Sequence, residues 1–283
     1  MKRLLILIFF SFPLITSAQS LELGLMLGAS GYQGDLSPST NITSTSGLHP
    51  SIGFFGRINR NRLWSYRLSF SYGVVSANDA DAQDESRRRR NLNFRSKILE
   101  LALTGELNFL GRDRRLSPYL FGGIALFNFN PQAEYQGRRV DLQPLGTEGQ
   151  GLDNFPDRYN RVQFSIPFGI GLKFAINDRL NLGVEIGLRK TFTDYLDDVS
   201  GTYVNYNELL AANGQLSADL SNRTGEFLGT DPLQLETGTR RRGNPDSKDW
   251  YFINGVTLSY SLFDDKNSWG GKHGKKQLGC PFQ

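Results

Sequence analysis

Large apolar residues alternate with small or polar residues along much of the chain. Residues 162–176, "VQFSIPFGIGLKFAI", give the clearest case, with a large apolar side chain at every even position. A period of two places these side chains on one face of a β-strand and the intervening residues on the other. Pro167 lacks the N–H through which a strand pairs, so we expect a bulge or irregular pairing there.

The same alternation recurs elsewhere and gives eight candidate strands in all. It is clear in 21–30, 64–74, 98–109 and 179–189, and weaker in about 51–58, 117–129 and 250–263. The connections alternate between short (59–62, 111–115, 177–179) and long (31–50, 77–96, 130–161, 194–248). Outer-membrane barrels alternate short and long connections in this way, whereas nothing in a soluble β-sandwich requires such alternation. We therefore predict an all-β fold, an eight-stranded antiparallel transmembrane β-barrel with short periplasmic turns and long extracellular loops.

The start of the chain predicts export. Lys2 and Arg3 precede an apolar run at 4–15 and then small residues, the order of a secretory signal peptide. We expect a signal peptide over 1–18, an outer-membrane barrel over 19–263 and a tail over 264–283. An even number of crossings leaves both termini in the periplasm. Without Lys2 and Arg3 the formal net charge falls from +4 to about +2, which gives no reason to expect a nucleic-acid partner.

The inward face of the predicted barrel is charged. Eight strands enclose an interior just wide enough to be filled by side chains, so these charges are expected to pair across it and exclude a diffusion pore. The inward charges are Glu22, Arg67, Glu100, Glu106, Lys173 and Glu185, with Arg189 as a further candidate. The predicted periplasmic turns are basic and hold Arg60, Arg62, Arg112, Arg114, Arg115 and Arg179.

Residues suited to catalysis or metal binding are scarce. The chain has two histidines, His49 and His273, which the predicted topology puts on opposite sides of the membrane, and it has no histidine–cysteine cluster. We expect no cofactor, no catalytic activity and a solvated His49. The alternative is a small lipid-modifying enzyme in which His49 activates Ser46 or Ser51 as a nucleophile.

The long loops carry features of their own. Arginines 87–90 follow the acidic stretch 79–85, and we expect the two to pair locally, with binding to phosphates of outer-membrane lipids as the alternative. The same alternatives apply to 238–250. Spaced leucines in 205–222 predict a short amphipathic helix, interrupted at Asn213-Gly214.

Four separated motifs resemble the PorG family, outer-membrane barrels of the type IX secretion system. They are "GYQGDL" (31–36), "DYLDDVSGTY" (194–203), "GNPDSKDWYF" (243–252) and "CPF" (280–282). The resemblance spans nearly the whole mature chain, although this chain ends in Gln283 rather than at the phenylalanine. It implies a non-enzymatic part of the secretion machinery, associated with the periplasmic ring of the lipoprotein PorK and PorN. A general structural barrel and the lipid-modifying enzyme are the alternatives.

Cys280 is the only cysteine, so it cannot close an intramolecular disulfide. A leftover cysteine in an oxidising compartment suggests an intermolecular disulfide, and the resemblance implies a PorK-like lipoprotein as the partner. Lys272, Lys275 and Lys276 would favour the reactive thiolate, and Pro281 restricts the backbone. We expect the tail through Phe282 to contact the partner; a free thiol is the alternative.

Overall fold

The computed structural model describes residues 20–37, 47–111 and 114–262. The predicted signal peptide, the C-terminal tail with Cys280, and Ser46 and Arg112 lie outside these residues.

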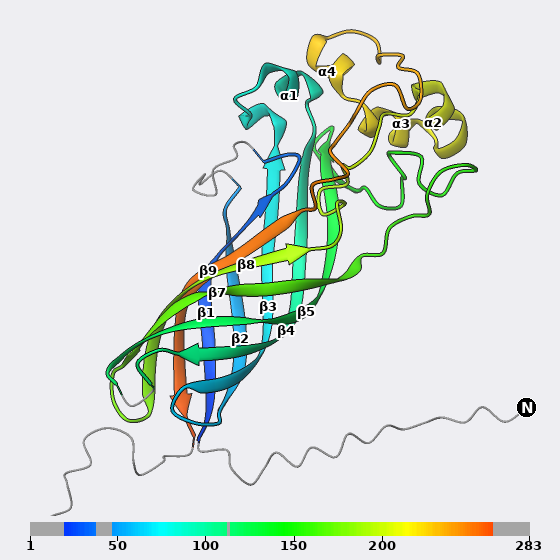
Figure 1. Ribbon diagram of the computed structural model, residues 1–283. Helices are drawn as coiled ribbons and strands as arrows, with labels where there is room; N and C mark the ends of the chain where they lie inside the picture. The colour runs from blue at the N-terminus through cyan, green and yellow to red at the C-terminus, as the bar shows by residue number, and fades with distance from the viewer. Residues whose placement is uncertain (1–19, 38–46, 112–113, 263–283) are drawn as a thin grey trace, which may run out of the picture.

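Eight antiparallel strands close into a barrel (Figure 1), so the predicted fold class is confirmed. Each strand pairs with its neighbour in the chain, and pairing of the first with the last closes the ring. The barrel strands are β1 (Ser20–Gln33), β2 (His49–Asn59), β3 (Trp64–Asn78), β4 (Asn93–Asn108), β5 (Leu116–Tyr135), β7 (Val162–Ala175), β8 (Leu180–Thr191) and β9 (Trp250–Ser261). A short ninth strand, β6 (Arg138–Asp141), pairs only with β5 and lies outside the ring.

Tight turns join the strands at one end of the barrel, which we call the short-turn end. Between β2 and β3, the side chain of Asn61 accepts hydrogen bonds from the backbone N–H groups of Leu63 and Trp64. Asn177 does the same for Arg179 and Leu180 between β7 and β8. An asparagine side chain that satisfies the next backbone donors makes such short reversals stable without further residues.

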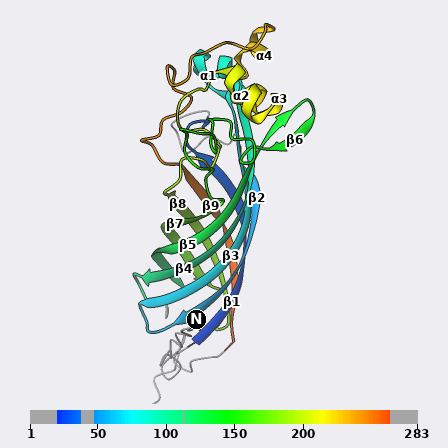
Figure 2. The same cartoon turned by 90° about the vertical axis from the view of Figure 1, so that its right-hand side faces the viewer.

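Long connections and helices cover the opposite end, the loop end (Figures 1 and 2). They contain a 3₁₀ turn (Asp79–Asp81) and the helices α1 (Glu85–Arg90), α2 (Tyr206–Asn213), α3 (Gln215–Ser221) and α4 (Thr224–Leu228). The predicted helix over 205–222 is confirmed as α2 and α3, separated at Gly214, which has a φ of 83°. The predicted local pairing of the arginine run is also confirmed, because Arg88 and Arg89 contact Glu85 while Arg90 contacts Asp79.

The strands next to two of these loops are longer than the alternation indicated. β4 begins at Asn93 rather than near 98, and β5 runs to Tyr135 rather than ending near 129. Backbone pairs such as Arg95 with Gln132 continue the ladder there, although the outward side chains have become polar. Apolar alternation therefore marks the part of each strand that faces the bilayer, and the backbone pairing extends beyond it.

The pairing between β5 and β7 is irregular where Pro167 lies, as predicted. The paired residues stop at Gly122 with Phe168 and resume at Ala125 with Ser165, in the same register. Pro167 still lies opposite Arg189 on the β8 side, so the strand keeps its path while one ladder loses its contacts.

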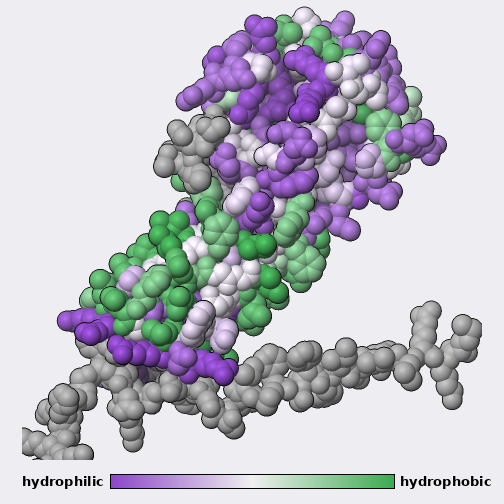
Figure 3. Space-filling view, viewed as in Figure 1, coloured by the Kyte–Doolittle hydropathy of each residue, from purple (hydrophilic) through white to green (hydrophobic). Residues whose placement is uncertain are grey.

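The outer face of the barrel is a continuous apolar belt (Figure 3). Side chains on it, including Leu27, Ile124 and Phe164, keep about 61–62 % of their surface exposed. A folded chain does not leave so many large apolar groups in water, so this belt requires a lipid environment. Among the described residues, no helix combines the length and apolar character needed to cross a bilayer.

The loop end of the lumen is closed by an apolar core. Phe94 and Ile98 of β4, Phe127 and Phe129 of β5, and Ile253 of β9 are buried there. Leu36, Leu142, Leu196 and Leu220 of the loops pack on the same cluster. The loops are therefore anchored to the barrel by burial of apolar surface, which ties their arrangement to the fold.

The closing seam between β1 and β9 depends on two glycines that face each other. Gly28 pairs with Gly255, and a Cβ added at Gly28 would lie 1.9 Å from the carbonyl oxygen of Asn254. We expect Gly28→Ala to destabilise the barrel by about 1–3 kcal/mol through overpacking. Gly56→Ala is the matched control, because the nearest atom to its added Cβ is a Leu23 methyl at 3.8 Å. Heat-dependent migration on gels measures both, and equal melting of the two variants would contradict the seam argument.

Candidate functional sites in the lumen and at the loop junction

Glu106 lies at the centre of the charged lumen near the short-turn end. Its carboxylate is 2.9 Å from Nε of Arg57, 2.5 Å from Nζ of Lys173 and 3.4 Å from Nε of Arg67. The side chain of Glu106 has no exposed surface. One carboxylate thus holds three cations from β2, β7 and β3 across the interior.

Two further carboxylates complete this lower cluster. Glu22 of β1 lies 2.8 Å from Arg57 and also accepts a hydrogen bond from Asn59. Glu185 of β8 accepts two hydrogen bonds from Arg67, at 2.5 and 3.0 Å, and one from the hydroxyl of Tyr119. A bidentate arginine–carboxylate pair fixes the orientation of both groups as well as their distance.

A second cluster lies nearer the loop end. Arg189 of β8 donates to both oxygens of Glu100 on β4, at 3.1 and 3.2 Å, and to the carbonyl of Ile253. The hydroxyl of Tyr251 donates to Glu100 at 2.6 Å and contacts Ser165. Glu100 is fully buried, so these contacts replace the water that it would otherwise need.

The two clusters together are electrically balanced. They contain four cations and four carboxylates, namely Arg57, Arg67, Lys173, Arg189, Glu22, Glu100, Glu106 and Glu185. The six charges predicted from sequence, and Arg189, all lie inside the barrel; they pair with one another except Glu22, whose partner is Arg57. A cavity of about 10 Å³ beside Arg67 and Glu185 has room for at most one water molecule. The interior is a filled plug.

Sequence reasoning missed Arg57, which lies in the middle of the lower cluster. The signal was present, because Phe54 and Ile58 face outward on β2 and leave Arg57 on the inward face. Gly56 interrupts the apolar series between them, which weakened the pattern.

The predicted turn arginines are at the short-turn end where the structure describes them. Arg60 and Arg62 follow β2, Arg114 and Arg115 precede β5, and Arg179 precedes β8. Arg115 lies over the ring of Phe174 at 5.6 Å, and Arg179 donates to the hydroxyl of Tyr260. The turns therefore form a basic rim beneath the apolar belt.

His49 does contact a serine, but the serine is Ser76 of β3. The distance from its Nε2 to the Ser76 hydroxyl is 2.7 Å. Ser51, one of the two expected partners, is buried, and its hydroxyl has no hydrogen-bond partner within the described part of the chain. Among the residues that the structure describes, no carboxylate contacts His49.

Three motifs that lie far apart in the sequence meet at the base of the loops, in a site that we call the loop junction. The hydroxyl of Tyr32, from "GYQGDL", lies 2.5 Å from Oδ2 of Asp197, in "DYLDDVSGTY". It also lies 3.1 Å from Oδ1 of Asp249, in "GNPDSKDWYF". The other oxygen of Asp249 accepts the backbone N–H of Leu196, and that of Asp197 accepts the N–H of Val199.

Further contacts extend the loop junction to the other loops. Asp35 accepts the backbone N–H of Asn244, and the carbonyl of Asp35 accepts a hydrogen bond from Arg90 of α1. Arg90 also donates to the carbonyl of Arg242. Backbone and side-chain groups of three loops thus satisfy one another directly.

Arg242 holds the second half of the loop junction. It lies 3.0 Å from Glu148, which also accepts the backbone N–H groups of Ser200 and Gly201. Asp198 has a φ of 67°, a conformation that aspartate tolerates better than most residues, and accepts hydrogen bonds from Thr147 and Tyr159. The "DD" pair therefore sends one carboxyl to each half of the loop junction.

Burial dominates the acid–base properties of this site. It raises the pKa of Asp197 and Asp249 well above their usual range. The nearby carboxyl of Asp35 raises the pKa of Asp197 further, and the carboxyls of Asp197 and Asp194 raise that of Asp249. Burial also raises the pKa of Asp198 to about 6, even though Arg242 opposes this. Hydrogen bonds from Tyr32, Thr147 and Tyr159 hold the acids in place. The described residues contain no group of three or more potential metal ligands.

The closed ring, the plugged interior and the apolar belt define an eight-stranded transmembrane β-barrel of the outer-membrane type. Residues 1–221 match the family described as "Domain of unknown function (DUF6089)", and the chain belongs to that family. None of the curated proteins matches the sequence.

Solved structures with a similar fold are bacterial outer-membrane barrels. Ail of Yersinia pestis, in complex with the heparin analogue sucrose octasulfate, is 9 % identical with a TM-score of 0.40, over 86 % of this chain and 98 % of its own. Neisserial surface protein A is 7 % identical with a TM-score of 0.41, over 85 % and 96 %. A major outer membrane protein of Thermus thermophilus is 10 % identical with a TM-score of 0.41, over 86 % and 99 %. These similarities concern the fold alone.

Proposed function

We propose that this protein is a non-enzymatic outer-membrane component of the type IX secretion machinery that contacts a periplasmic ring of PorK-like and PorN-like proteins. The observation that carries the proposal is the loop junction. The three motifs of the described chain that resemble the PorG family, "GYQGDL", "DYLDDVSGTY" and "GNPDSKDWYF", contribute Tyr32, Asp197 and Asp249 to one buried site. The three motifs that resemble the PorG family therefore belong to one structural unit, the loop junction.

The plugged lumen supports a scaffold rather than a channel. Its charges pair across the interior, and the cavity beside Arg67 and Glu185 has room for at most one water molecule. In this proposal residues 1–18 direct export, 19–263 anchor the protein in the outer membrane, and 264–283 reach the ring in the periplasm.

Deletion of the gene, followed by complementation, tests the function. A secretion component should leave cargo trapped in the periplasm when deleted, and His49→Ala should restore secretion fully. The contact between His49 and Ser76 favours a lipid-modifying enzyme as the second candidate. In that case His49→Ala and Ser76→Ala should both abolish a change in outer-membrane lipids while cargo is still secreted.

Orientation is a separate prediction that cysteine labelling checks. In a Cys280→Ser background, single cysteines at Ser86 or Gly214, exposed at the loop end, should react with a membrane-impermeant reagent in intact cells. Cysteines at Asn61 or Asp178, exposed in the short turns, should react only after the outer membrane is opened. The reverse pattern would place the loop end in the periplasm and remove the basis for the proposed ring contact.

Cys280 offers a covalent test of that ring contact. The proposal expects a disulfide between Cys280 and a PorK-like lipoprotein, since a single exported cysteine has no internal partner. Thiol-blocked membranes run without reductant should show a larger species that disappears with reductant and in Cys280→Ser. A monomeric band alone would limit the tail to a non-covalent contact.

A further inference from the structure

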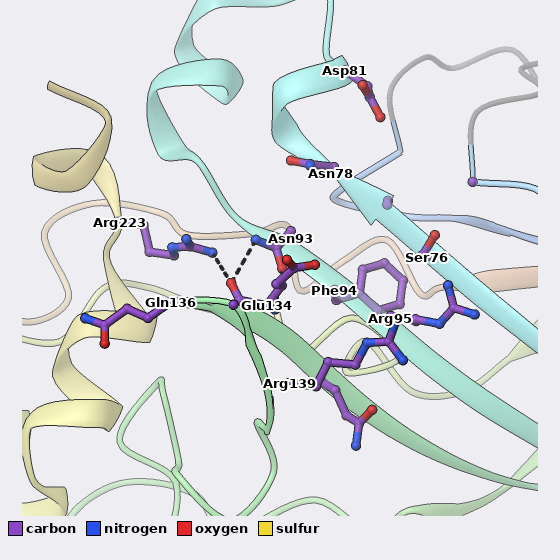
Figure 4. Close-up of a pocket in the computed structure, with 14 residues that line it drawn as sticks. Ser76, Asn78, Asp81, Asn93, Phe94, Arg95, Glu134, Gln136, Arg139 and Arg223 are labelled. Carbon is purple, nitrogen blue, oxygen red and sulfur yellow. Dashed lines mark hydrogen bonds between the residues drawn. The ribbon is translucent and has the colours of Figure 1, made fainter.

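A polar pocket of about 490 Å³ lies on the outer wall of the barrel, where β3, β4 and β5 extend above the apolar belt (Figure 4). Ser76 and Asn78 of β3, Asn93 and Arg95 of β4, and Gln132 of β5 line it. Gln136 and Gly137, with φ values of 49° and 74°, form a two-residue turn that folds β6 back onto β5. This turn sets Arg139 opposite Glu134 and brings a second arginine to the pocket.

Arg95 and Arg139 line the pocket without an ion pair to any described residue. A third lining arginine, Arg223, is engaged, because it pairs with Glu226 at 2.8 Å and donates to the carbonyl of Glu134 (Figure 4). Two carboxylates, Asp81 and Glu134, also line the pocket. With Arg223 paired to Glu226, two arginines and two carboxylates remain in the lining, and neither Arg95 nor Arg139 forms an ion pair with a described residue, so both guanidinium groups can reach an external anion.

The pocket lies directly above the part of the wall that contacts lipid. The outward positions of β4 descend from Arg95 through Lys97 to Leu99 and Leu101, which are 42 % and 48 % exposed. At about 3.4 Å per residue, Arg95 is about 14 Å along the strand from Leu99, and strand tilt reduces its height above the belt to about 10 Å. Long basic side chains at this level reach the headgroup layer.

We propose that this pocket binds the phosphate of an anionic lipid headgroup whose acyl chains lie against Leu99 and Leu101. Arginine suits this role because its planar donors match phosphate oxygens in pairs. Lys97 lies on the same outward face of β4, between the pocket and the apolar belt, and adds a third positive charge near the bound headgroup. The side-chain amide N–H groups of Asn78 supply neutral donors for the remaining oxygens of the headgroup, whereas the amide of Gln132 already donates to Asp141 at 2.6 Å.

Native mass spectrometry of the full chain released from nanodiscs tests the proposal. The discs contain neutral phosphatidylcholine with a minority of phosphatidylglycerol. The parent protein should retain phosphatidylglycerol selectively, and the double variant Arg95→Gln/Arg139→Gln should lose this retention by about 5-fold for each arginine removed. Arg138→Gln, an exposed arginine next to Arg139 that does not line the pocket, should retain the lipid like the parent.

Heat-dependent gel migration confirms that each variant is folded before the comparison. Inorganic phosphate in excess separates two sources of the affinity. If inorganic phosphate displaces the lipid, the pocket recognises the phosphate alone. If the lipid is retained in excess phosphate and this retention depends on the arginines, the pocket recognises the headgroup and the acyl chains together. Equal retention by the double variant and the parent, or an equal loss in Arg138→Gln, would overturn the proposal.

Discussion

Replacing Glu106 by glutamine is expected to destabilise the folded barrel by about 3–5 kcal/mol, the range for breaking a buried ion pair from one side. Glu106 contacts Arg57, Arg67 and Lys173; the two arginines are buried, and the side chain of Lys173 is 12 % exposed. Glutamine keeps the size of the side chain but removes the charge, and its amide donors would face other donors. Urea unfolding in lipid vesicles, followed by tryptophan fluorescence, measures the loss.

Two comparison variants make this result specific. Glu85→Gln also removes a carboxylate with two arginine partners, but Glu85 and its partners are exposed, so little change is expected. Glu106→Gln combined with Lys173→Gln restores the balance of charge and should recover part of the lost stability. If Glu106→Gln unfolds at the same urea concentration as the parent, the lumen network does not hold the barrel together.

The fold could be predicted from sequence because each strand except at the seam pairs with its neighbour in the chain. Alternation then fixes which face of each strand meets lipid, and the order of the strands follows from the short turns. The extensions of β4 and β5 could not be predicted this way, since Arg95 and Gln132 face water and carry no apolar signal. Backbone pairing, together with burial of inward side chains such as Phe94, holds these extensions in the sheet.

The lumen charges could be identified, but their partners could not. Alternation shows that Arg67 and Glu185 both face inward, yet they are 118 residues apart and lie on different strands. Their meeting depends on the tilt and stagger of the strands, which alternation does not report.

The loop junction was beyond sequence reasoning for a different reason. Tyr32 and Asp249 are 217 residues apart, and the segments around them have no periodic pattern. The family motifs singled out the segments that contain these residues. The contact between Tyr32 and Asp249 depends on the pairing of β1 with β9, which closes the barrel. Register across that seam sets Tyr32 opposite Tyr251, close to Asp249.

Raising the pH is expected to loosen the loop end while the barrel stays folded. The Tyr32 hydroxyl has one hydrogen but lies between the carboxyls of Asp197 and Asp249, so the site is satisfied when one of the carboxyls keeps its proton. Burial raises the pKa of both carboxyls and raises that of Asp198 to about 6 from an ordinary 3.8. At higher pH each of them becomes a buried charge.

The direction in which stability changes with pH follows from these raised pKa values. A carboxyl whose pKa is higher in the folded state contributes stability that is complete below its unfolded pKa and is lost as the pH rises through its folded pKa. For Asp198 the difference corresponds to about 3 kcal/mol, complete below about pH 4 and lost as the pH passes about 6. Asp197 and Asp249 extend the loss to higher pH.

Hydrogen exchange at pH 4 and pH 8, corrected for the intrinsic effect of pH, measures this loosening. The amides of Leu196 and Val199, which donate to Asp249 and Asp197, should lose protection at pH 8, while strand amides of the barrel should not. Asp198→Asn should flatten part of the pH dependence, because asparagine has the same shape without a charge to bury. Its amide oxygen accepts from one of the Thr147 and Tyr159 hydroxyls, and the other hydroxyl can turn to accept from the amide N–H. Greater protection of Leu196 at pH 8 than at pH 4 would show that the acids of the loop junction are already ionised and that other contacts stabilise the loops.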